Sequence, residues 1–121
     1  MKLTILSIFS AAVLCVSLSA NATDCEYPTK IDVPNGESSS EQEMIEGQKQ
    51  VKQYIGVMEA YLECLEKEMQ EEMAGMDPEA EQEAMQQSQA LRDARHNAAV
   101  DEMEEVANNF NAAVRAYKAA N

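Results

Sequence analysis

The chain has no tryptophan, and aromatic residues make up only 5% of its 121 positions. Alanine and methionine supply much of the apolar content instead. Because an alanine side chain buries little area, such a core contributes little free energy of folding for its length. We therefore expect a thin core that depends on a cross-link or a partner subunit for stability.

Apart from the many carboxylates, which are too frequent for any pair of them to be informative, residues that commonly perform catalysis are scarce. The chain has one histidine, His96, and no glycine-rich loop. Catalysis needs a nucleophile, a base and an orienting group in one pocket, and no such set is evident. His96 is the residue type of a pH switch or a metal ligand, but a single histidine on a helix is more often a partly buried structural residue. The sequence predicts a non-enzymatic protein without a cofactor.

Positive charge is limited, with 9 Lys and Arg against 22 Asp and Glu and a formal net charge of −13. Phosphate backbones and anionic lipids repel a chain of this charge, which argues against nucleic-acid binding. The partners that suit it are proteins, cationic peptides or divalent cations.

Only one long apolar run is present, over residues 3–18, and Lys2 precedes it. The small residues Ala20 and Ala22 then match the pattern that signal peptidase recognises. The run is too short for a stable membrane span, and no later segment replaces it. We predict a signal peptide over residues 1–22, no membrane span, and a periplasmic or secreted chain beginning at Thr23.

Removal of the signal peptide takes Cys15 with it and leaves Cys25 and Cys64. Lipid attachment at Cys15 is disfavoured because Leu14, rather than a small residue, precedes it. A pair of cysteines in an oxidising compartment predicts one disulfide. The bridge could join one chain or two chains, and both alternatives stay open at this stage.

Residues 23–39 contain Pro28, Pro34 and a turn pair at 35–36, and they predict an extended arm. A capping box of Ser40 and Glu43 then begins the first helix, expected over about 40–74. The rise from Ser40 to position 64 is about 36 Å. The arm can span up to about 50 Å, so it can run back along this helix to position 64.

Apolar residues in the first helix alternate at spacings of four and three, as in a coiled coil, and only Gln48 breaks the series. Tyr54 and Tyr61 widen this stripe. Gly47 and Gly56 cost about 1 kcal/mol each in a helix interior, so we expect another backbone to approach them closely. The stripe consists of Met44, Val51, Ile55, Met58, Leu62, Leu65 and Met69.

Residues 75–78 interrupt the helical pattern. Gly75 suits a left-handed position after a helix end, Asp77 an N-cap, and Pro78 the first position of a second helix over about 78–119. So short a connector makes the two helices antiparallel neighbours. The predicted fold class is all-α, with a long antiparallel two-helix hairpin over residues 40–121 and an extended N-terminal arm clipped by a disulfide.

Two helices alone leave part of each stripe uncovered. We expect helix–helix association, either as a homodimeric four-helix bundle or with another protein. This is the leading functional prediction, an interaction or structural component of the envelope. The predicted interaction face consists of Val51, Ile55, Met58, Leu62, Leu65, Val106, Phe110, Val114 and Tyr117.

The hairpin tip provides an alternative function, metal binding. Its methionines are soft ligands suited to Cu(I) or Ag(I), although methionine also fills helical cores. Its carboxylates could hold a divalent cation weakly or form a solvated surface, and they lack calcium-loop spacing. The tip residues are Glu63, Glu66, Glu68, Glu71, Glu72, Asp77, Glu79, Glu81 and Glu83, with Met69, Met73, Met76 and Met85.

Three segments, CEYPTKIDVPNG (25–36), EMIEGQKQVKQYIGVMEAYLECLE (43–66) and RHNAAVDEMEEVANNFNAAVRAYKAA (95–120), carry a family resemblance. The chain resembles small uncharacterised exported proteins of Gram-negative bacteria, which share a Cys-x-x-Pro arm, a Tyr-Leu-x-Cys-Leu helix and a Phe-Asn pair. The resemblance covers most of the chain after the signal peptide, apart from the tip. It implies a periplasmic location and a Cys25–Cys64 bridge, and it implies no activity.

Export can be tested by intact mass spectrometry of the protein recovered from the periplasm of a Gram-negative host. We expect the mass of residues 23–121, less the two hydrogens lost when a disulfide forms. A mass that retains residues 1–22 would contradict cleavage, and a mass without the loss of hydrogen would contradict the bridge.

Overall fold

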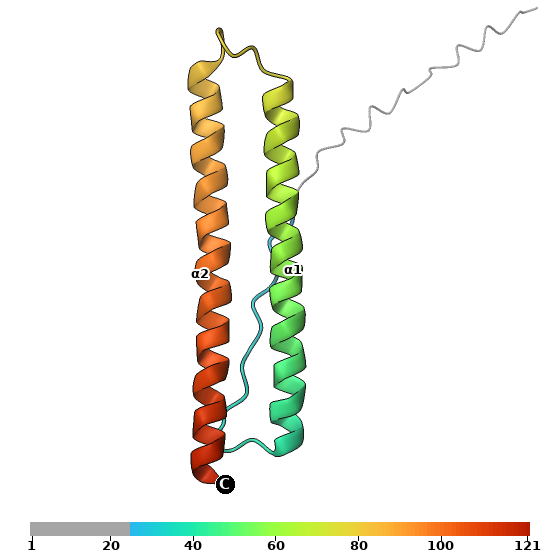
Figure 1. The fold of residues 1–121 in the computed structure, drawn as a ribbon, viewed down its shortest axis with the longest axis vertical. Helices are drawn as coiled ribbons and strands as arrows, with labels where there is room; N and C mark the ends of the chain where they lie inside the picture. The colour runs from blue at the N-terminus through green and yellow to red at the C-terminus, as the bar shows by residue number, and fades with distance from the viewer. Residues whose placement is uncertain (1–24) are drawn as a thin grey trace, which may run out of the picture.

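The fold is a pair of long helices with an arm beside them (Figure 1). The computed structural model describes residues 25–121, so the predicted signal peptide lies outside the described residues. Helix α1 covers Glu41–Ala74 and α2 covers Gln82–Ala120, and the residues described include no strand. The all-α hairpin is confirmed. Neither helix has the length and apolar content needed to cross a membrane, within the part of the chain described.

Helix α1 begins at the predicted capping box. Ser40 Oγ accepts a hydrogen bond from the Glu43 backbone N–H at 3.3 Å, and the Glu43 carboxylate accepts one from the Ser40 N–H at 2.6 Å. The Ser40 N–H and the Ser40 hydroxyl, which donates to the same carboxylate at 2.8 Å, lower the pKa of Glu43 because both bonds favour its charged form. A cap of this kind stabilises a helix by about 1 kcal/mol.

The connector differs from the sequence prediction in two respects. Gly75 has φ −88° and ψ −8°, so the expected left-handed conformation is wrong. Helix α2 begins at Gln82, later than the expected start at Pro78. Asp77 does act as a cap, but only for a separate turn, since its Oδ1 accepts from the Glu79 N–H at 3.0 Å and its carbonyl from Glu81 at 2.9 Å.

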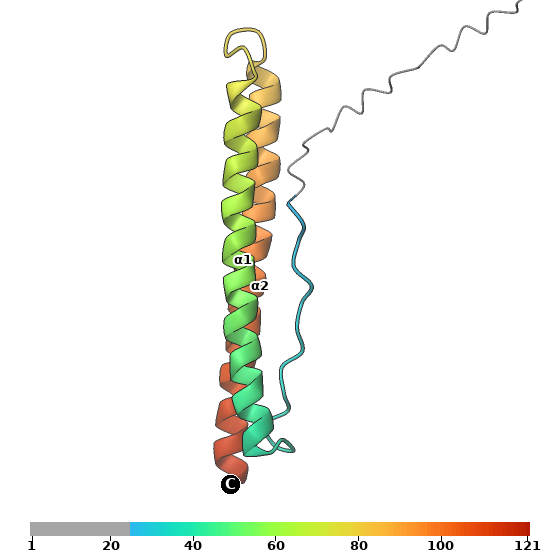
Figure 2. The same ribbon diagram turned by 90° about the vertical axis from the view of Figure 1, so that its right-hand side faces the viewer.

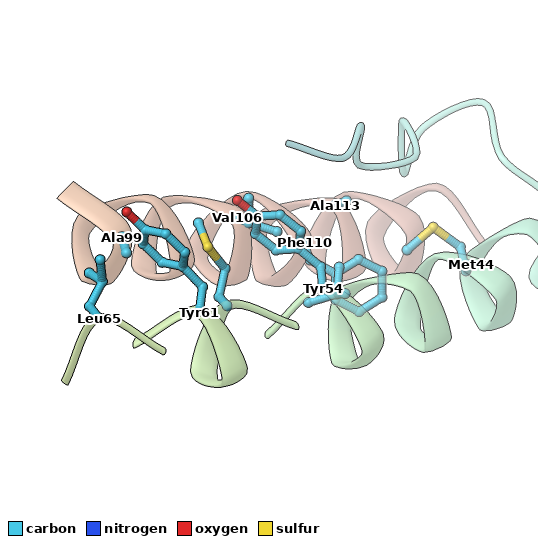
Figure 3. Close-up of a cluster of buried hydrophobic side chains, with 10 residues drawn as sticks. Met44, Tyr54, Tyr61, Leu65, Ala99, Val106, Phe110 and Ala113 are labelled. Carbon is cyan, nitrogen blue, oxygen red and sulfur yellow. The ribbon is translucent and has the colours of Figure 1, made fainter. Parts of the chain in front are cut away.

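The core lies between the two helices, away from the tip. Met58 and Ala99 are 0% exposed, and Val106 is 1% exposed. Figure 3 shows side chains from both helices meeting along this line. Leu65 is the last buried residue of α1 and Ala99 the first of α2, so the buried core ends before the acidic tip.

The arm forms a third element that lies along one side of the hairpin and runs antiparallel to α1 (Figure 2). Cys25 is bonded to Cys64 with their Cα atoms 5.8 Å apart. The bridge therefore closes within one chain, as the first of the two alternatives proposed. Ile31 and Val33 of the arm pack against the core.

Two glycines allow the end of the arm to approach the helices. A Cβ atom on Gly47 would lie 2.6 Å from Pro34 Cγ, so the arm does approach this position closely, although with a side chain and not with the backbone that was expected. A Cβ atom on Gly36 would lie 1.9 Å from the Ala113 carbonyl oxygen, so this turn rests directly on the α2 backbone. The same expectation for Gly56 is wrong, because nothing lies within 4 Å of its Cβ position.

We expect Cys64→Ser to lower the free energy of unfolding by about 3–4 kcal/mol, because the cross-link spans 39 residues and restricts the unfolded chain. Urea denaturation of oxidised wild type and variant would measure this difference. Residues 25–40 should also become sensitive to protease in the variant. Equal midpoints and equal protease resistance would show that other contacts hold the arm.

Candidate functional site

The hairpin has two flanks, one on each side of the line where its helices meet. Successive residues of a helix are rotated by about 100° around its axis. The residue four positions before the fully buried Met58 and the residue three positions after it therefore lie on the same side of that line. These are Tyr54 and Tyr61. The residue three positions before Met58 is Ile55 and the residue four positions after it is Leu62. Both lie on the other side. We call the first side the arm flank and the second the open flank.

A single carboxylate joins three elements on the arm flank. The Tyr27 hydroxyl of the arm donates to Glu102 Oε2 of α2 at 3.2 Å. The Tyr54 hydroxyl of α1 donates to Glu102 Oε1. The Tyr27 ring also meets the Tyr61 ring edge-on, with centroids 5.1 Å apart. Together with the disulfide, this cluster holds the arm in the groove between the helices.

Burial and the nearby charge of Glu102 raise the pKa of both Tyr27 and Tyr54, and burial is the larger cause in each case. Both hydroxyls therefore keep their protons and remain donors. Lys30 of the arm forms an ion pair with Glu105 of α2 at 2.9 Å, and this bond raises the pKa of Lys30. Because both groups of this pair are largely exposed, it orients the arm more than it stabilises it.

The open flank has no covering segment of this kind within the described residues. Ile55 and Leu62 of α1 and Met103 and Val114 of α2 are partly buried and pack against the core from its edge. On α2, partly buried residues recur at alternating spacings of four and three, the spacing of a helix-packing stripe. They are His96, Val100, Met103, Ala107, Val114 and Tyr117, with the buried Phe110 completing the series.

This α2 row carries no acidic side chain, although acidic residues are frequent in the chain. Asp101, Glu102, Glu104 and Glu105 all lie outside the row. An apolar row without acidic residues, on a chain of net charge −13, is typical of a surface that contacts another molecule.

The nine residues of the predicted interaction face divide into two sets. Buried residues already packed inside the hairpin are Val51, Met58, Leu65, Val106 and Phe110. The partly buried residues are Ile55, Leu62, Val114 and Tyr117. A partner would therefore reach only the second set directly. The prediction omitted Met103, which belongs to the same row.

At the tip, contacts between the helices occupy several of the acidic side chains. Arg92 of α2 pairs with Glu66 of α1, and Arg95 pairs with Glu68 at 3.6 Å. Ser88 donates to Glu72. The tip is thus less strongly negative than its sequence indicated, because the hairpin brings two arginines to it from α2.

The tip methionines are partly buried, and Met73 Sδ accepts a hydrogen bond from Gln89 at 3.9 Å. The described residues contain no group of three or more His, Cys, Asp or Glu side chains placed to hold a metal ion. The methionine cluster of the alternative prediction is thus partly buried, and no such group of His, Cys, Asp or Glu lies beside it in the part of the chain described.

A shallow groove of about 300 Å³ lies beside the arm on the α1 side. It is mostly apolar, and Tyr54 is the only one of its lining residues with a titratable side chain. Its chemistry therefore suits contact with an apolar group better than catalysis. The lining residues are Pro28, Thr29, Ile31, Gln50, Gln53, Tyr54 and Val57.

Sequence reasoning did not identify the cluster of Tyr27, Tyr54 and Glu102. Tyrosine and glutamate are each common in exposed helices, and Tyr27 lies 75 positions from Glu102 in the chain. The only available signal was the reach of the arm, which placed it beside α1 without indicating its contacts with α2.

No family model matches the chain, and no curated protein or solved structure matches it. The resemblance to exported proteins of Gram-negative bacteria therefore stays a prediction. The open flank is the candidate functional site on the basis of its own geometry.

The tyrosine–carboxylate cluster predicts a dependence of stability on pH. Because the folded pKa of Tyr54 is raised above its ordinary value, its contribution is complete below about pH 10 and is lost as the pH rises further. Tyr54→Phe should cost about 1–2 kcal/mol at pH 7 and should flatten the loss of stability above pH 10.

Urea titrations from pH 7 to 11 would compare wild type, Tyr54→Phe and Glu102→Gln. The Glu102→Gln variant should also flatten the alkaline slope, since it removes the charge that opposes ionisation. Identical slopes in all three proteins would contradict this account of the cluster.

Proposed function

We propose that this protein is a non-enzymatic, exported component of the bacterial envelope that acts through helix–helix association at the open flank. The observation that carries the proposal is the difference between the two flanks. The arm, its disulfide and Glu102 cover one flank, whereas the other flank carries a partly exposed apolar row.

The spacing of the apolar residues on the open flank favours a helix as the partner that binds there. Ile55 and Leu62 on α1 are seven residues apart, and the α2 row repeats at the same interval. Helices that cross at about 20° interleave side chains at this interval over several turns. An extended peptide would contact the groove at a shorter repeat and would match fewer of these positions.

The arm supports the proposal because it limits the contact surface to one side. Tyr61 and the arm-facing edge of the core are covered within the same chain. A partner helix is then directed to the open flank rather than to either groove at random. The arm thus acts as a built-in third layer.

Export and the absence of catalysis are supported by the same bond. A disulfide persists mainly in oxidising compartments such as the periplasm, which fits the predicted signal peptide. Because Cys25 and Cys64 are joined to each other, neither is available as a nucleophile.

Site-specific photo-cross-linking in the periplasm of the exporting cell would test the proposal. A photoreactive residue at Ile55, on the open flank, should form a covalent adduct with a protein. The matched control is Val57, an aliphatic residue of the same helix that is 49% exposed beside the arm. Adducts at Val57 and none at Ile55, or none at either position, would overturn the proposal.

A further inference from the structure

Charge is distributed unevenly along the hairpin. Every charged residue in the tip segment 63–83 is acidic except Lys67. At the opposite end of α2, over residues 108–121, the only charged side chains are Arg115 and Lys118. Arg92 and Arg95 balance two of the tip carboxylates, and the others in that segment still exceed the positive charge.

The two helices are aligned so that the open flank has a definable centre. The Tyr54 hydroxyl donates a hydrogen bond to Glu102, so these two residues lie at the same height along the hairpin axis. The residues that follow them, Ile55 and Met103, therefore lie at nearly the same height on the open flank. The apolar positions extend from this level to Met69 on α1 in one direction and to Tyr117 on α2 in the other. Ile55 and Met103 thus lie near the middle of the apolar surface.

We propose that the helices that occupy the open flank belong to a second copy of this chain, placed antiparallel, so that two hairpins form a four-helix bundle. This inference rests on the proposed function and identifies its partner. A two-fold axis near Ile55 and Met103 places the same face of each copy against the other, as a closed dimer requires. The apolar rows of the two copies then overlap along their full length.

Electrostatics selects the antiparallel orientation. A parallel pair would place two acidic tips side by side, and like charges at short range oppose association. In the antiparallel pair, the segment from Glu66 to Glu72 of one copy lies beside Arg115 and Lys118 of the other. Each end of the dimer then combines the acidic tip of one copy with the opposite end of the other copy, where Arg115 and Lys118 of α2 lie beside Glu41, Glu43 and Glu46 of α1 and the charge is mixed.

Zero-length carbodiimide cross-linking of an equal mixture of ¹⁴N- and ¹⁵N-labelled chains would test both the partner and its orientation. We expect isotope-mixed peptides that join Lys118 to a carboxylate of residues 66–72. The bond cannot form within one hairpin, because Arg92 contacts Glu66 and α2 rises about 39 Å from Arg92 to Lys118. Before proteolysis for peptide analysis, the sample should have the mass of a dimer in light scattering.

Isotope-mixed peptides that join Lys67 only to carboxylates of residues 63–83 would show a parallel dimer and overturn the inference. A monomer at all concentrations would also overturn it. Photo-cross-linking at Ile55 distinguishes an error in the identity of the partner from an error in the proposed helix–helix association. An adduct with a mass other than that of two copies rejects the second copy and keeps helix association, whereas the lack of any adduct at Ile55 rejects both.

Charge reversal gives an independent measurement. Arg115→Glu combined with Lys118→Glu should weaken dimerisation about tenfold or more by sedimentation equilibrium, and the effect should shrink as salt is added. Lys49→Glu is the matched control for a single reversal, since Lys49 is largely exposed and pairs with Glu46 of its own helix. Circular dichroism would verify that each variant is folded. Equal dissociation constants for the double variant and wild type would contradict the antiparallel arrangement.

Discussion

The arm is held at both of its ends against the groove between α1 and α2. Near its start, Cys25 is bonded to Cys64, and near its end Gly36 rests on the backbone of α2 at Ala113. Between these points Tyr27 shares the Glu102 carboxylate with Tyr54. Because two helices of this composition bury little apolar area, the third layer supplied by the arm determines which side of the hairpin is closed.

This arrangement makes the two sides of the hairpin chemically different. The arm flank combines tyrosines, a shared carboxylate and an ion pair, which are directional contacts suited to one fixed segment. The open flank has a repeating row on α2 that contains no acidic side chain, and it suits contact along a whole helix. The tip extends beyond both surfaces as a charged, largely exposed end.

Patterns of local origin were predictable from the sequence. The capping box at Ser40, the long uninterrupted α1 and the antiparallel hairpin follow from short-range signals, and the structure contains all three. The start of α2 was less predictable, because Asp77 can cap either a helix or a single turn, and only the packing of the chain selects the turn. Gly56 shows the same limit, since a glycine in a helix does not reveal whether another backbone lies beside it.

The sequence by itself determined the helical periods, the acidic character of the tip, and a pair of cysteines with enough arm between them to meet. Only the tertiary structure decided that the bridge closes within one chain, that Glu102 serves both Tyr27 and Tyr54, and that Ile55 and Leu62 stay at the edge of the core. The physical reason is that a helical period defines an apolar stripe wider than one helix–helix contact. Which part of that stripe is covered depends on where a distant segment packs, and this is not encoded in local spacing.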